Sequence, residues 1–398
     1  MAFSIVNRPV GDFAGWAATP DVQVVAGDFG GGVQTDIALV NRAPGWSSIP
    51  VAVSGSSGFT IQNRPAGDFA AWAATPGVEL VTGDFNGDSR SDLALVNRLG
   101  GWTTIPVALG DEDGFIIENR PAGDFAAWAA TPGVELVTGD FNGDFQTDLA
   151  LVNRAGGWTT IPVALSRDDG FTIQNRPAGD FAAWAATPGV ELLTGDFNGD
   201  FESDLALVNR LSGWTTIPLA LSDDDEFIIK NYPVGDFAAW ATTPGVELVT
   251  GDFDGNSRTS RTDIALVNHA PGWTSVPVAV AGFTEFTIEN RPAADFAAWA
   301  ASPNVAVVAE DFNDDGATDL ALVNRAPGWT TIPVALGGEE RFTVQNAPVG
   351  DFARWAATPG VQLVSGDFND DSKIDLGLVS NAGGWTSIPL ALSQEWLI

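Results

Sequence analysis

Residues 59–114 read FTIQNRPAGDFAAWAATPGVELVTGDFNGDSRSDLALVNRLGGWTTIPVALGDEDG, and this unit occurs seven times in the chain without linkers. The copies span residues 3–58, 59–114, 115–170, 171–226, 227–285, 286–341 and 342–398, and the fifth departs from the spacing through an insertion near 258–261. A unit of this size cannot bury its apolar face alone, so the copies must stack on one another. The repeat therefore predicts one domain over residues 1–398.

Each copy contains four short runs with strand character, separated by Gly, Pro, Asn and Asp. In the second copy these runs are 59–62, 78–82, 92–96 and 102–109, and residues 68–74 allow one helical turn before Pro76. Four strands per unit, repeated seven times, predict an all-β fold, a seven-bladed β-propeller of four-stranded blades. A solenoid is the weaker alternative, because its end repeats would become polar caps.

The phase of the repeat predicts how the ring closes. If the loop GDFNGDSRSD joins the innermost two strands of a blade, residues 3–7 have no blade before them. We expect this N-terminal strand to become the outer strand of the last blade, which removes an open sheet edge. Pro50 and Pro106 lie inside the third strand, where a proline predicts a bulge or a locally unpaired position.

The charge of the chain excludes several classes of partner. The net charge is −33, with Lys230 and Lys373 as the only lysines, so nucleic-acid phosphates and anionic membranes are repelled. No apolar run is long enough to span a membrane, and the N-terminus lacks the features of a signal peptide. We expect a soluble protein without membrane insertion, cytoplasmic or unconventionally exported. A monomeric ring is expected, and an oligomer is left open.

The acidic loop of each copy has the spacing of a calcium site. In the second copy, Asp84, Asn86, Asp88 and Asp92 place oxygen side chains at positions 1, 3, 5 and 9, with a main-chain carbonyl at position 7. Position 12 is Leu95 rather than the Glu of an EF-hand, so the loop belongs on a β-hairpin. The alternative is an Asp/Asn-rich turn that needs no metal. We expect structural Ca2+ here, because clustered carboxylates repel one another without a cation.

Five copies of the loop are complete, and two are not. The first has Gly30 and Gly32 at its middle positions and is expected to bind no metal, and in the fifth the insertion is expected to displace Asp263. The complete sets are Asp84, Asn86, Asp88, Asp92; Asp140, Asn142, Asp144, Asp148; Asp196, Asn198, Asp200, Asp204; Asp311, Asn313, Asp315, Asp319; and Asp367, Asn369, Asp371, Asp375.

Two other loops recur almost unchanged, and propeller connectivity places both on the face opposite the acidic hairpins. They contain tryptophan, which can stack on a sugar ring, beside Asn, Asp and Arg, which can bond to hydroxyl groups. The alternative is that these residues pack the blades together. The candidate ligand residues are Trp16, Trp72, Trp128, Trp184, Trp240, Trp299 and Trp355, with Asp68, Asp124, Asp180, Asn63, Arg64, Asn97, Arg98 and Trp102.

The run GDFNGD…DLALV resembles the FG-GAP/VCBS repeats of seven-bladed propellers, including those of integrin heads. The longer pattern N-x8-W-x11-D-x-N-G-D is similar to that of the fungal lectins typified by the Psathyrella velutina lectin. That resemblance implies a calcium-containing propeller that binds N-acetylglucosamine-type sugars between its blades. It covers all seven copies, although residues 73–77 (AATPG) depart from the polar stretch of those lectins.

The repeat also bears on the class of function. Catalytic sites break symmetry, and no Ser/His/Asp set or unique carboxylate pair stands out, so an enzyme is not expected. The near-identity of the loops favours a multivalent lectin that binds glycans or glycoproteins. A non-catalytic protein-interaction scaffold of integrin-head type is the alternative.

Overall fold

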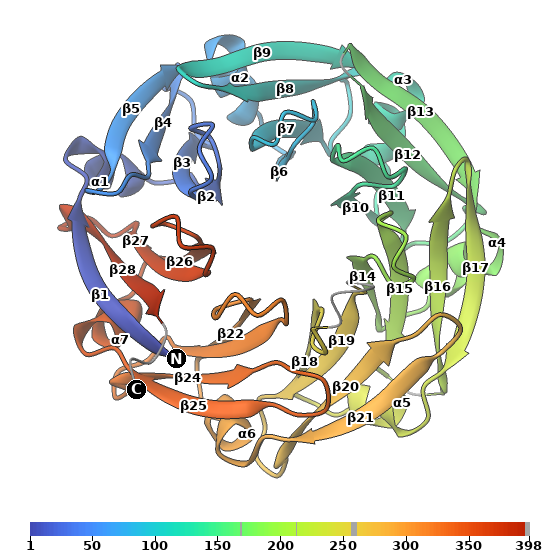
Figure 1. Cartoon of the computed structure of the whole chain (residues 1–398). Coiled ribbons are helices and arrows are strands. Elements are labelled where there is room, and N and C mark those ends of the chain that lie inside the picture. Colours follow the sequence, from blue (N-terminus) through green and yellow to red (C-terminus); the bar gives the residue numbers. More distant parts are fainter. Residues whose placement is uncertain (168, 212, 256–260, 395–398) are drawn as a thin grey trace.

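Seven four-stranded antiparallel sheets stand around a central opening in the computed structural model, which describes residues 1–167, 169–211, 213–255 and 261–394 (Figure 1). The predicted seven-bladed β-propeller is thereby confirmed. From the inner to the outer strand, the blades are: blade 1, β2 (Val22–Gly27), β3 (Asp36–Asn41), β4 (Ser48–Val53) and β5 (Thr60–Pro65); blade 2, β6 (Val78–Gly83), β7 (Asp92–Asn97), β8 (Thr104–Asp111) and β9 (Gly114–Pro121); blade 3, β10 (Val134–Gly139), β11 (Asp148–Asn153), β12 (Thr160–Arg167) and β13 (Gly170–Pro177); blade 4, β14 (Val190–Gly195), β15 (Asp204–Asn209), β16 (Thr216–Asp223) and β17 (Glu226–Pro233); blade 5, β18 (Val246–Gly251), β19 (Asp263–Asn268), β20 (Ser275–Ala281) and β21 (Phe286–Pro292); blade 6, β22 (Val305–Glu310), β23 (Asp319–Asn324), β24 (Thr331–Leu336) and β25 (Thr343–Pro348); blade 7, β26 (Val361–Gly366), β27 (Asp375–Ser380), β28 (Ser387–Gln394) and β1 (Ala2–Pro9).

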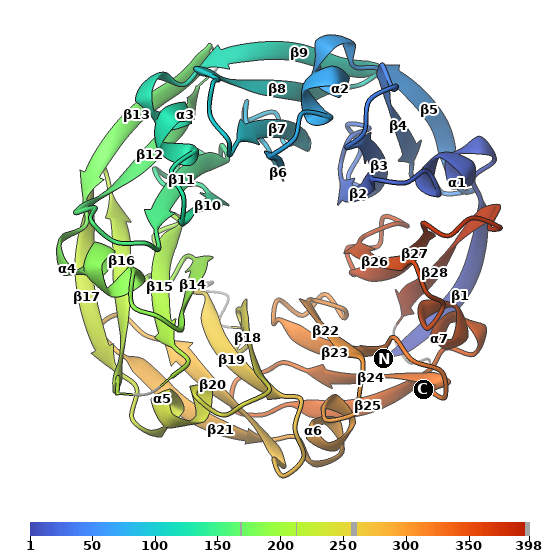
Figure 2. The ribbon, with the colours of Figure 1, turned by 180° about the vertical axis from the view of Figure 1, so that it is seen from behind.

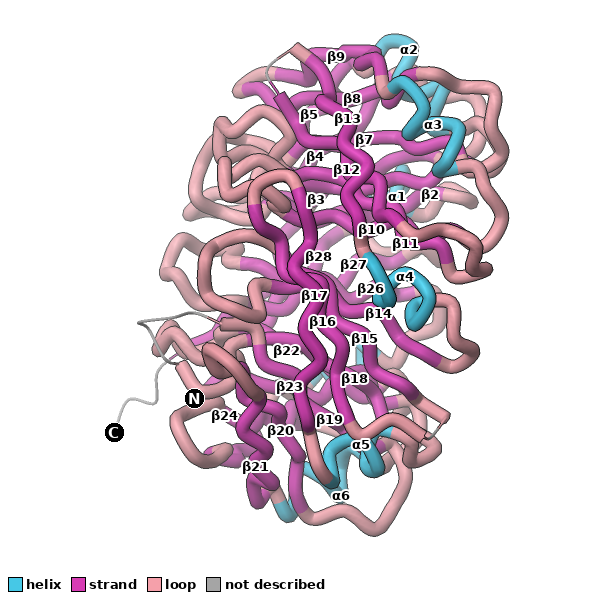
Figure 3. The backbone as a smooth tube through the Cα atoms, turned by 90° about the vertical axis from the view of Figure 1, so that its right-hand side faces the viewer, coloured by secondary structure: helices cyan, strands magenta, loops and turns pink. Residues whose placement is uncertain are grey.

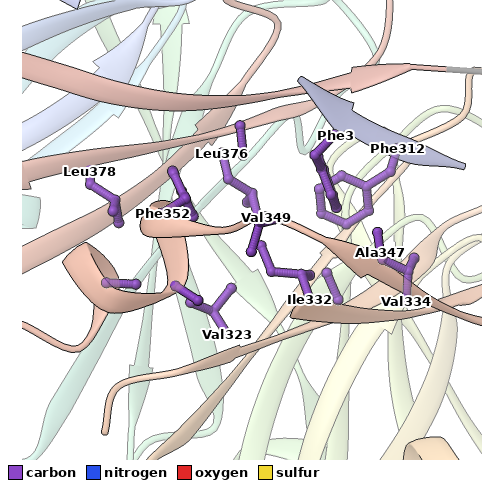
Figure 4. Close-up of a cluster of buried hydrophobic side chains, with 14 of the residues drawn as sticks. Phe3, Phe312, Val323, Ile332, Val334, Ala347, Val349, Phe352, Leu376 and Leu378 are labelled. Carbon is purple, nitrogen blue, oxygen red and sulfur yellow. The ribbon is translucent and has the colours of Figure 1, made fainter. Parts of the chain in front are cut away.

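The N-terminal strand closes the ring, as predicted. Strand β1 pairs antiparallel with β28 over its whole length, from Ala2 opposite Gln394 to Pro9 opposite Ser387. Phe3 is buried against Phe312 of blade 6, with ring centroids 6.3 Å apart in an edge-to-face arrangement (Figure 4). The last blade is therefore built from both ends of the chain, and its outer edge is covered.

The second strand of each blade is the core of the fold. In β7 every residue from Asp92 to Asn97 is buried, because neighbouring blades cover both faces of the sheet. This explains why the run LALV that follows Asp92 is continuously apolar instead of alternating.

The third strand contains the locally unpaired position that its proline predicts. In blade 3, β12 pairs with β11 at Ala164 and Val163 and then stops, one residue before Pro162. Its pairing with β13 continues through Pro162, which faces Asn175. The proline thus releases the connection between β11 and β12 from the sheet, because it cannot donate a ladder hydrogen bond.

A short helix precedes the inner strand of each blade. These helices lie together on one face of the ring (Figures 2 and 3), and the hairpins between the inner two strands lie on the other. No helix in the described part of the chain is long and apolar enough to cross a membrane. The helices are α1 (Asp12–Ala17), α2 (Gly67–Ala73), α3 (Gly123–Ala129), α4 (Gly179–Ala185), α5 (Asp236–Ala241), α6 (Ala294–Ala300) and α7 (Asp351–Ala356).

On the hairpin face, one main-chain hydrogen bond joins each blade to the next. The residue directly before the aspartate that starts the second strand donates its N–H to the carbonyl at position 1 of the preceding acidic loop, over 2.5–3.1 Å. The pairs are Ser91–Asp28, Thr147–Asp84, Ser203–Asp140, Thr262–Asp196, Thr318–Asp252, Ile374–Asp311 and, across the closing junction, Thr35–Asp367. The acidic loops therefore form a continuous hydrogen-bonded ring.

Candidate functional site

The two recurring tryptophan sets meet in one pocket. In blade 3, Trp128 from α3 and Trp158 from the β11–β12 connection line the same cavity of about 260 Å³. The remaining lining residues are Gly157, Thr159, Thr160, Pro162 and Asn175.

The same pocket recurs around the ring. Cavities in blades 1, 4 and 5 are lined by the equivalent residues, and the smallest of the four has a volume of about 170 Å³. Their tryptophan and asparagine residues are Trp16, Trp46 and Asn63; Trp184, Trp214 and Asn231; and Trp240, Trp273 and Asn290. The same positions hold Trp72, Trp102 and Asn119 in blade 2, Trp299, Trp329 and Asn346 in blade 6, and Trp355, Trp385 and Asn7 in blade 7.

Local sequence explains how each pocket forms. Pro162 ends the pairing between β11 and β12, so the connection that carries Trp158 can leave the sheet. Gly157 has a φ of 92°, a conformation that other residues rarely adopt, and it turns the chain immediately before that tryptophan. Asn175 lies opposite Pro162 in the register, which brings its amide to the pocket wall.

The pocket offers an aromatic wall and neutral polar groups. Trp128 and Trp158 are partly exposed, Thr159 and Asn175 are exposed, and none of the lining residues is charged. Indole rings can pack on the C–H face of a pyranose, and hydroxyl and amide groups can bond to its hydroxyls. Volumes of about 170 to 260 Å³ lie below those of pockets for drug-sized ligands, which suits a single sugar ring.

The candidate arginine Arg64 lies elsewhere, within the junction of two blades. It is 1% exposed, and its Nη1 donates to the carbonyl of Phe29 at 2.6 Å and to that of Asp111 at 3.1 Å. Its guanidinium also lies over the Phe115 ring, 5.7 Å from the centroid. Arg64 therefore joins blade 1 to blade 2, which is the packing role that the sequence left open.

Asn97 and Arg98 also hold the scaffold. Asn97 donates to the carbonyl of Gly100 at 2.9 Å and so closes the β7–β8 connection. Arg98 donates to the carbonyl of Val134 in the next blade and lies 3.5 Å from the Glu79 carboxylate. Arg42, Arg154, Arg210 and Arg325 make the equivalent inter-blade bond.

Two of the candidate aspartates, Asp124 and Asp180, do not line the cavities of blades 3 and 4. Asp68, Asp124 and Asp180 are exposed in the first turns of α2, α3 and α4. The threonines and the proline, by contrast, line the pockets although the sequence analysis did not select them. Their signal was the near-constant run GW[ST][ST][IV]P, which contains the second tryptophan of every copy.

The acidic hairpins are organised by their own carboxylates. In blade 2 the Asp84 carboxylate accepts main-chain hydrogen bonds from Gly87 at 2.6 Å and Ser89 at 2.7 Å. The buried Asp92 carboxylate accepts one from Phe85 at 2.8 Å and one from Gly110 at 2.7 Å. Asp92 thus links the hairpin to the outer part of its blade.

Electrostatics in these loops oppose full ionisation. Burial, together with the nearby charges of Asp84 and Asp88, raises the pKa of Asp92 to about 7. The same causes raise the pKa of Asp204 to about 8. A divalent cation would relieve this repulsion, and the oxygen donors fit the preference of Ca2+.

The fifth loop corrects one expectation. Asp263 is not displaced by the insertion, because β19 starts at Asp263 and its carboxylate accepts the Phe253 N–H at 2.9 Å, as Asp92 does for Phe85. Asp252, Asp254 and Asp263 bring carboxylate oxygens within 4.8 Å of one another, and this is the one such trio among the described residues. Asn256 and residues 258–260 lie outside the described part of the chain.

In the first loop, the Asp28 carboxylate accepts a main-chain hydrogen bond from Gly31 at 2.9 Å. The turn therefore forms although Gly30 and Gly32 offer no side-chain oxygen. The expected absence of metal at this loop stays a prediction.

A comparison with known protein families gives no match, and no curated protein matches the chain. Among solved structures, the chain is similar to an Agrocybe aegerita lectin, described in terms of its specific recognition of non-reducing terminal N-acetylglucosamine. The TM-score is 0.65 at 15% identity, over 92% of this chain and 87% of that one. This similarity shows the β-propeller fold.

Two further structures have lower TM-scores and carry no argument about function. The WD40 domain of SCAP from fission yeast has a TM-score of 0.41 at 8% identity, over 99% of this chain and 98% of that one. Prolyl oligopeptidase B from Galerina marginata has a TM-score of 0.35 at 10% identity, over 92% of this chain and 57% of that one. The resemblance to FG-GAP/VCBS repeats stays a prediction.

Proposed function

We propose that this protein is a multivalent lectin, a non-catalytic protein that binds terminal sugars of glycans through repeated pockets. The observation that carries the proposal is the convergence of two tryptophans, an asparagine and adjacent threonines or serines in an uncharged pocket that recurs from blade to blade. A scaffold for one protein partner would need no such repetition of a small pocket. Individual sites of modest affinity gain about 10²–10⁴-fold when several engage one glycosylated surface.

N-acetylglucosamine-type sugars are the first ligands to test. An acetamido group presents one donor and one acceptor, which the amide of Asn175 can pair with, and its methyl group can pack on an indole ring. The lectin-like fold of the Agrocybe aegerita structure supports the same choice.

The experiment is a glycan array followed by calorimetric titration of the best sugar. Because the pockets are nearly equivalent, Asn175→Ala should lower the number of sites by about one without changing the affinity of the others. Thr172→Ala, on the same strand and exposed, is the matched control and should leave the number of sites unchanged. An array without hits, with no agglutination of red cells, would favour the protein-interaction scaffold instead.

We also propose that Ca2+ binds the acidic hairpins and has a structural role. It would be held by the carboxylates and amides at positions 1, 3, 5 and 9, where its charge would counteract the burial and the neighbouring carboxylates that raise the pKa of Asp92. The hydrogen-bonded ring through the loops supports this role, since a cation that stabilises one hairpin would also stabilise its junctions.

A further inference from the structure

Side chains of one blade reach over the acidic hairpin of the blade before it. We call such a side chain the bridging residue, and it stands two places before the aspartate that starts the second strand of its own blade. In blades 2 and 3 the bridging residues are Arg90 and Gln146. The N–H of the next residue along the chain donates to the position-1 carbonyl of the preceding hairpin, which fixes the main chain beside that hairpin.

Both bridging side chains contact the glycine at position 4 of the preceding hairpin. A Cβ on Gly31 would lie 2.6 Å from the Arg90 Nε, and a Cβ on Gly87 would lie 3.2 Å from the Gln146 Cγ. In blade 2 this glycine lies between the candidate metal ligands at positions 3 and 5. The bridging residue therefore lies at the rim of the candidate metal site of another blade.

In blade 1 the bridging residue supplies a positive charge where metal ligands are missing. Positions 3 and 5 of this hairpin are glycines, so Asp28 and Asp36 remain as its side-chain oxygen donors. Burial raises the pKa of Asp28, whereas main-chain hydrogen bonds and the charge of Arg90 act in the opposite direction. Arg90 Nη1 also lies 3.2 Å from Asp111 Oδ1 of its own blade, which anchors the guanidinium. The guanidinium thus balances part of the charge of this hairpin.

In blade 2 the bridging residue supplies an oxygen instead. Gln146 Oε1 is buried, and it accepts no hydrogen bond from the described part of the chain. A buried polar atom without a partner is unfavourable and indicates an ion or a water molecule beside it. Ca2+ takes about six to eight oxygens, and the hairpin itself offers one from each of positions 1, 3, 5, 7 and 9. A further oxygen at the rim fits this coordination.

Blades 3 and 4 show the same arrangement with charged side chains. Glu202 lies on Gly143 of the blade 3 hairpin, and its Oε2 is buried without a donor among the described residues. An arginine of blade 3 itself, Arg167, also pairs with a carboxylate of that hairpin. Arg261 donates to the Asn198 carbonyl of the blade 4 hairpin at 2.8 Å. Blades 1 and 2 differ more simply, since one hairpin faces a guanidinium and the other a neutral amide.

We propose that the bridging residue controls whether the preceding hairpin binds a cation. Gln146 lends its oxygen to the metal of blade 2, so that this ion joins blades 2 and 3. The Arg90 guanidinium takes the place of a metal in blade 1. This inference rests on the proposed binding of Ca2+, and it adds which hairpins take the ion and why.

The test counts bound Ca2+ by native mass spectrometry while the metal-free full chain is titrated with Ca2+. Gln146→Arg should lose one ion at a Ca2+ concentration that saturates the wild type, because a guanidinium then covers the blade 2 hairpin as Arg90 covers that of blade 1. Gln146→Ala should bind the same ion about tenfold more weakly, because an oxygen that supports the site is removed. Thr172→Arg, at an exposed position on β13, makes the same change in charge and is the control that should keep every ion.

A second pair of variants tests Arg90. Gly32→Asp restores the carboxylate at position 5, and a Cβ there would meet the Gln34 nitrogen at 3.7 Å, which is an ordinary contact. With Arg90 in place this variant should bind no additional ion, because the guanidinium still occupies the rim. Gly32→Asp/Arg90→Gln should bind one ion more than the wild type.

An unchanged number and affinity of ions in Gln146→Arg would overturn the proposal. An equal loss in Thr172→Arg, or an additional ion in Gly32→Asp while Arg90 is retained, would do the same. A wild type that binds no Ca2+ at all would refute the calcium proposal and this one with it. The titration of the wild type therefore distinguishes the two failures.

Discussion

Truncation of Phe3 to alanine tests whether the N-terminal strand is an integral part of blade 7. Phe3 is 8% exposed and packs edge-to-face on Phe312, and its equivalent Phe342 is 5% exposed and packs in the same way on Phe253. Truncation of a buried phenylalanine costs about 3–5 kcal/mol. Unfolding entropy of about 2.1 cal/mol/K per residue gives roughly 0.8 kcal/mol/K for a chain of this length, so Tm should fall by about 5 °C.

The assay is a calorimetric melt of the wild type, Phe3→Ala and Phe342→Ala. Phe342 directly precedes β25, in a blade that is continuous in sequence, so it reports the cost of the same truncation where ring closure is not involved. The two variants should melt within about 2 °C of each other. A clearly smaller effect at Phe3, or an unchanged Tm after deletion of residues 1–8, would refute the closure.

Three further predictions concern the metal, the pH and the arginines. Chelation should lower Tm, and Ca2+ but not Mg2+ should restore it; identical melts with and without chelator would contradict the calcium proposal. In chelator, unfolding free energy measured with urea should fall between about pH 4 and pH 8. Burial raises the pKa of Asp204 to about 8, so in this range the native state retains a proton that the unfolded state has already released. An unfolding free energy that rises over this pH range would contradict the prediction. Arg98→Ala should reduce the unfolding free energy by about 1.5–3 kcal/mol, because the hydrogen bond to the Val134 carbonyl is lost. The affinity for sugar, measured by calorimetry, should stay unchanged. Loss of sugar binding at unchanged stability would indicate instead that Arg98 contacts the ligand.

The fold could be read from the sequence because its signals are local and repeated. The continuous apolar run LALV marks the buried second strand, and the position of the acidic loop sets the phase that makes residues 3–7 the closing strand. The unpaired position in the third strand was also predictable from Pro162, because a residue without an N–H cannot donate a hydrogen bond to the neighbouring strand in any fold.

The site could be predicted only in part, because it depends on distances between segments. Trp128 and Trp158 lie in separate loops of the sequence, and only the position of α3 beside the released β11–β12 connection brings them together. The arginines were ambiguous for a different reason. A guanidinium can bond to a ligand or to main-chain carbonyls, and the burial that decides for Arg64 comes from the neighbouring blade.

Asp263 shows a further limit of counting positions. The insertion lengthens the loop, but the apolar residues after Asp263 fix the register of β19, so the carboxylate returns to its usual place opposite Gly251. The strand that follows the loop therefore predicts the position of this aspartate better than the length of the loop does.

The hydrogen-bonded ring of hairpins has a consequence for where the chain can begin. The Thr35 N–H donates to the Asp367 carbonyl across the closing junction. The same bond joins the other neighbouring blades, so the closing junction does not differ from them on this face. Strands β1 and β28 lie side by side, with Ala2 opposite Gln394. Circular permutants that connect β28 to β1 and open the chain between β4 and β5 would keep every such bond. The blade at which the polypeptide starts is thus interchangeable, and the ring itself is the unit of structure.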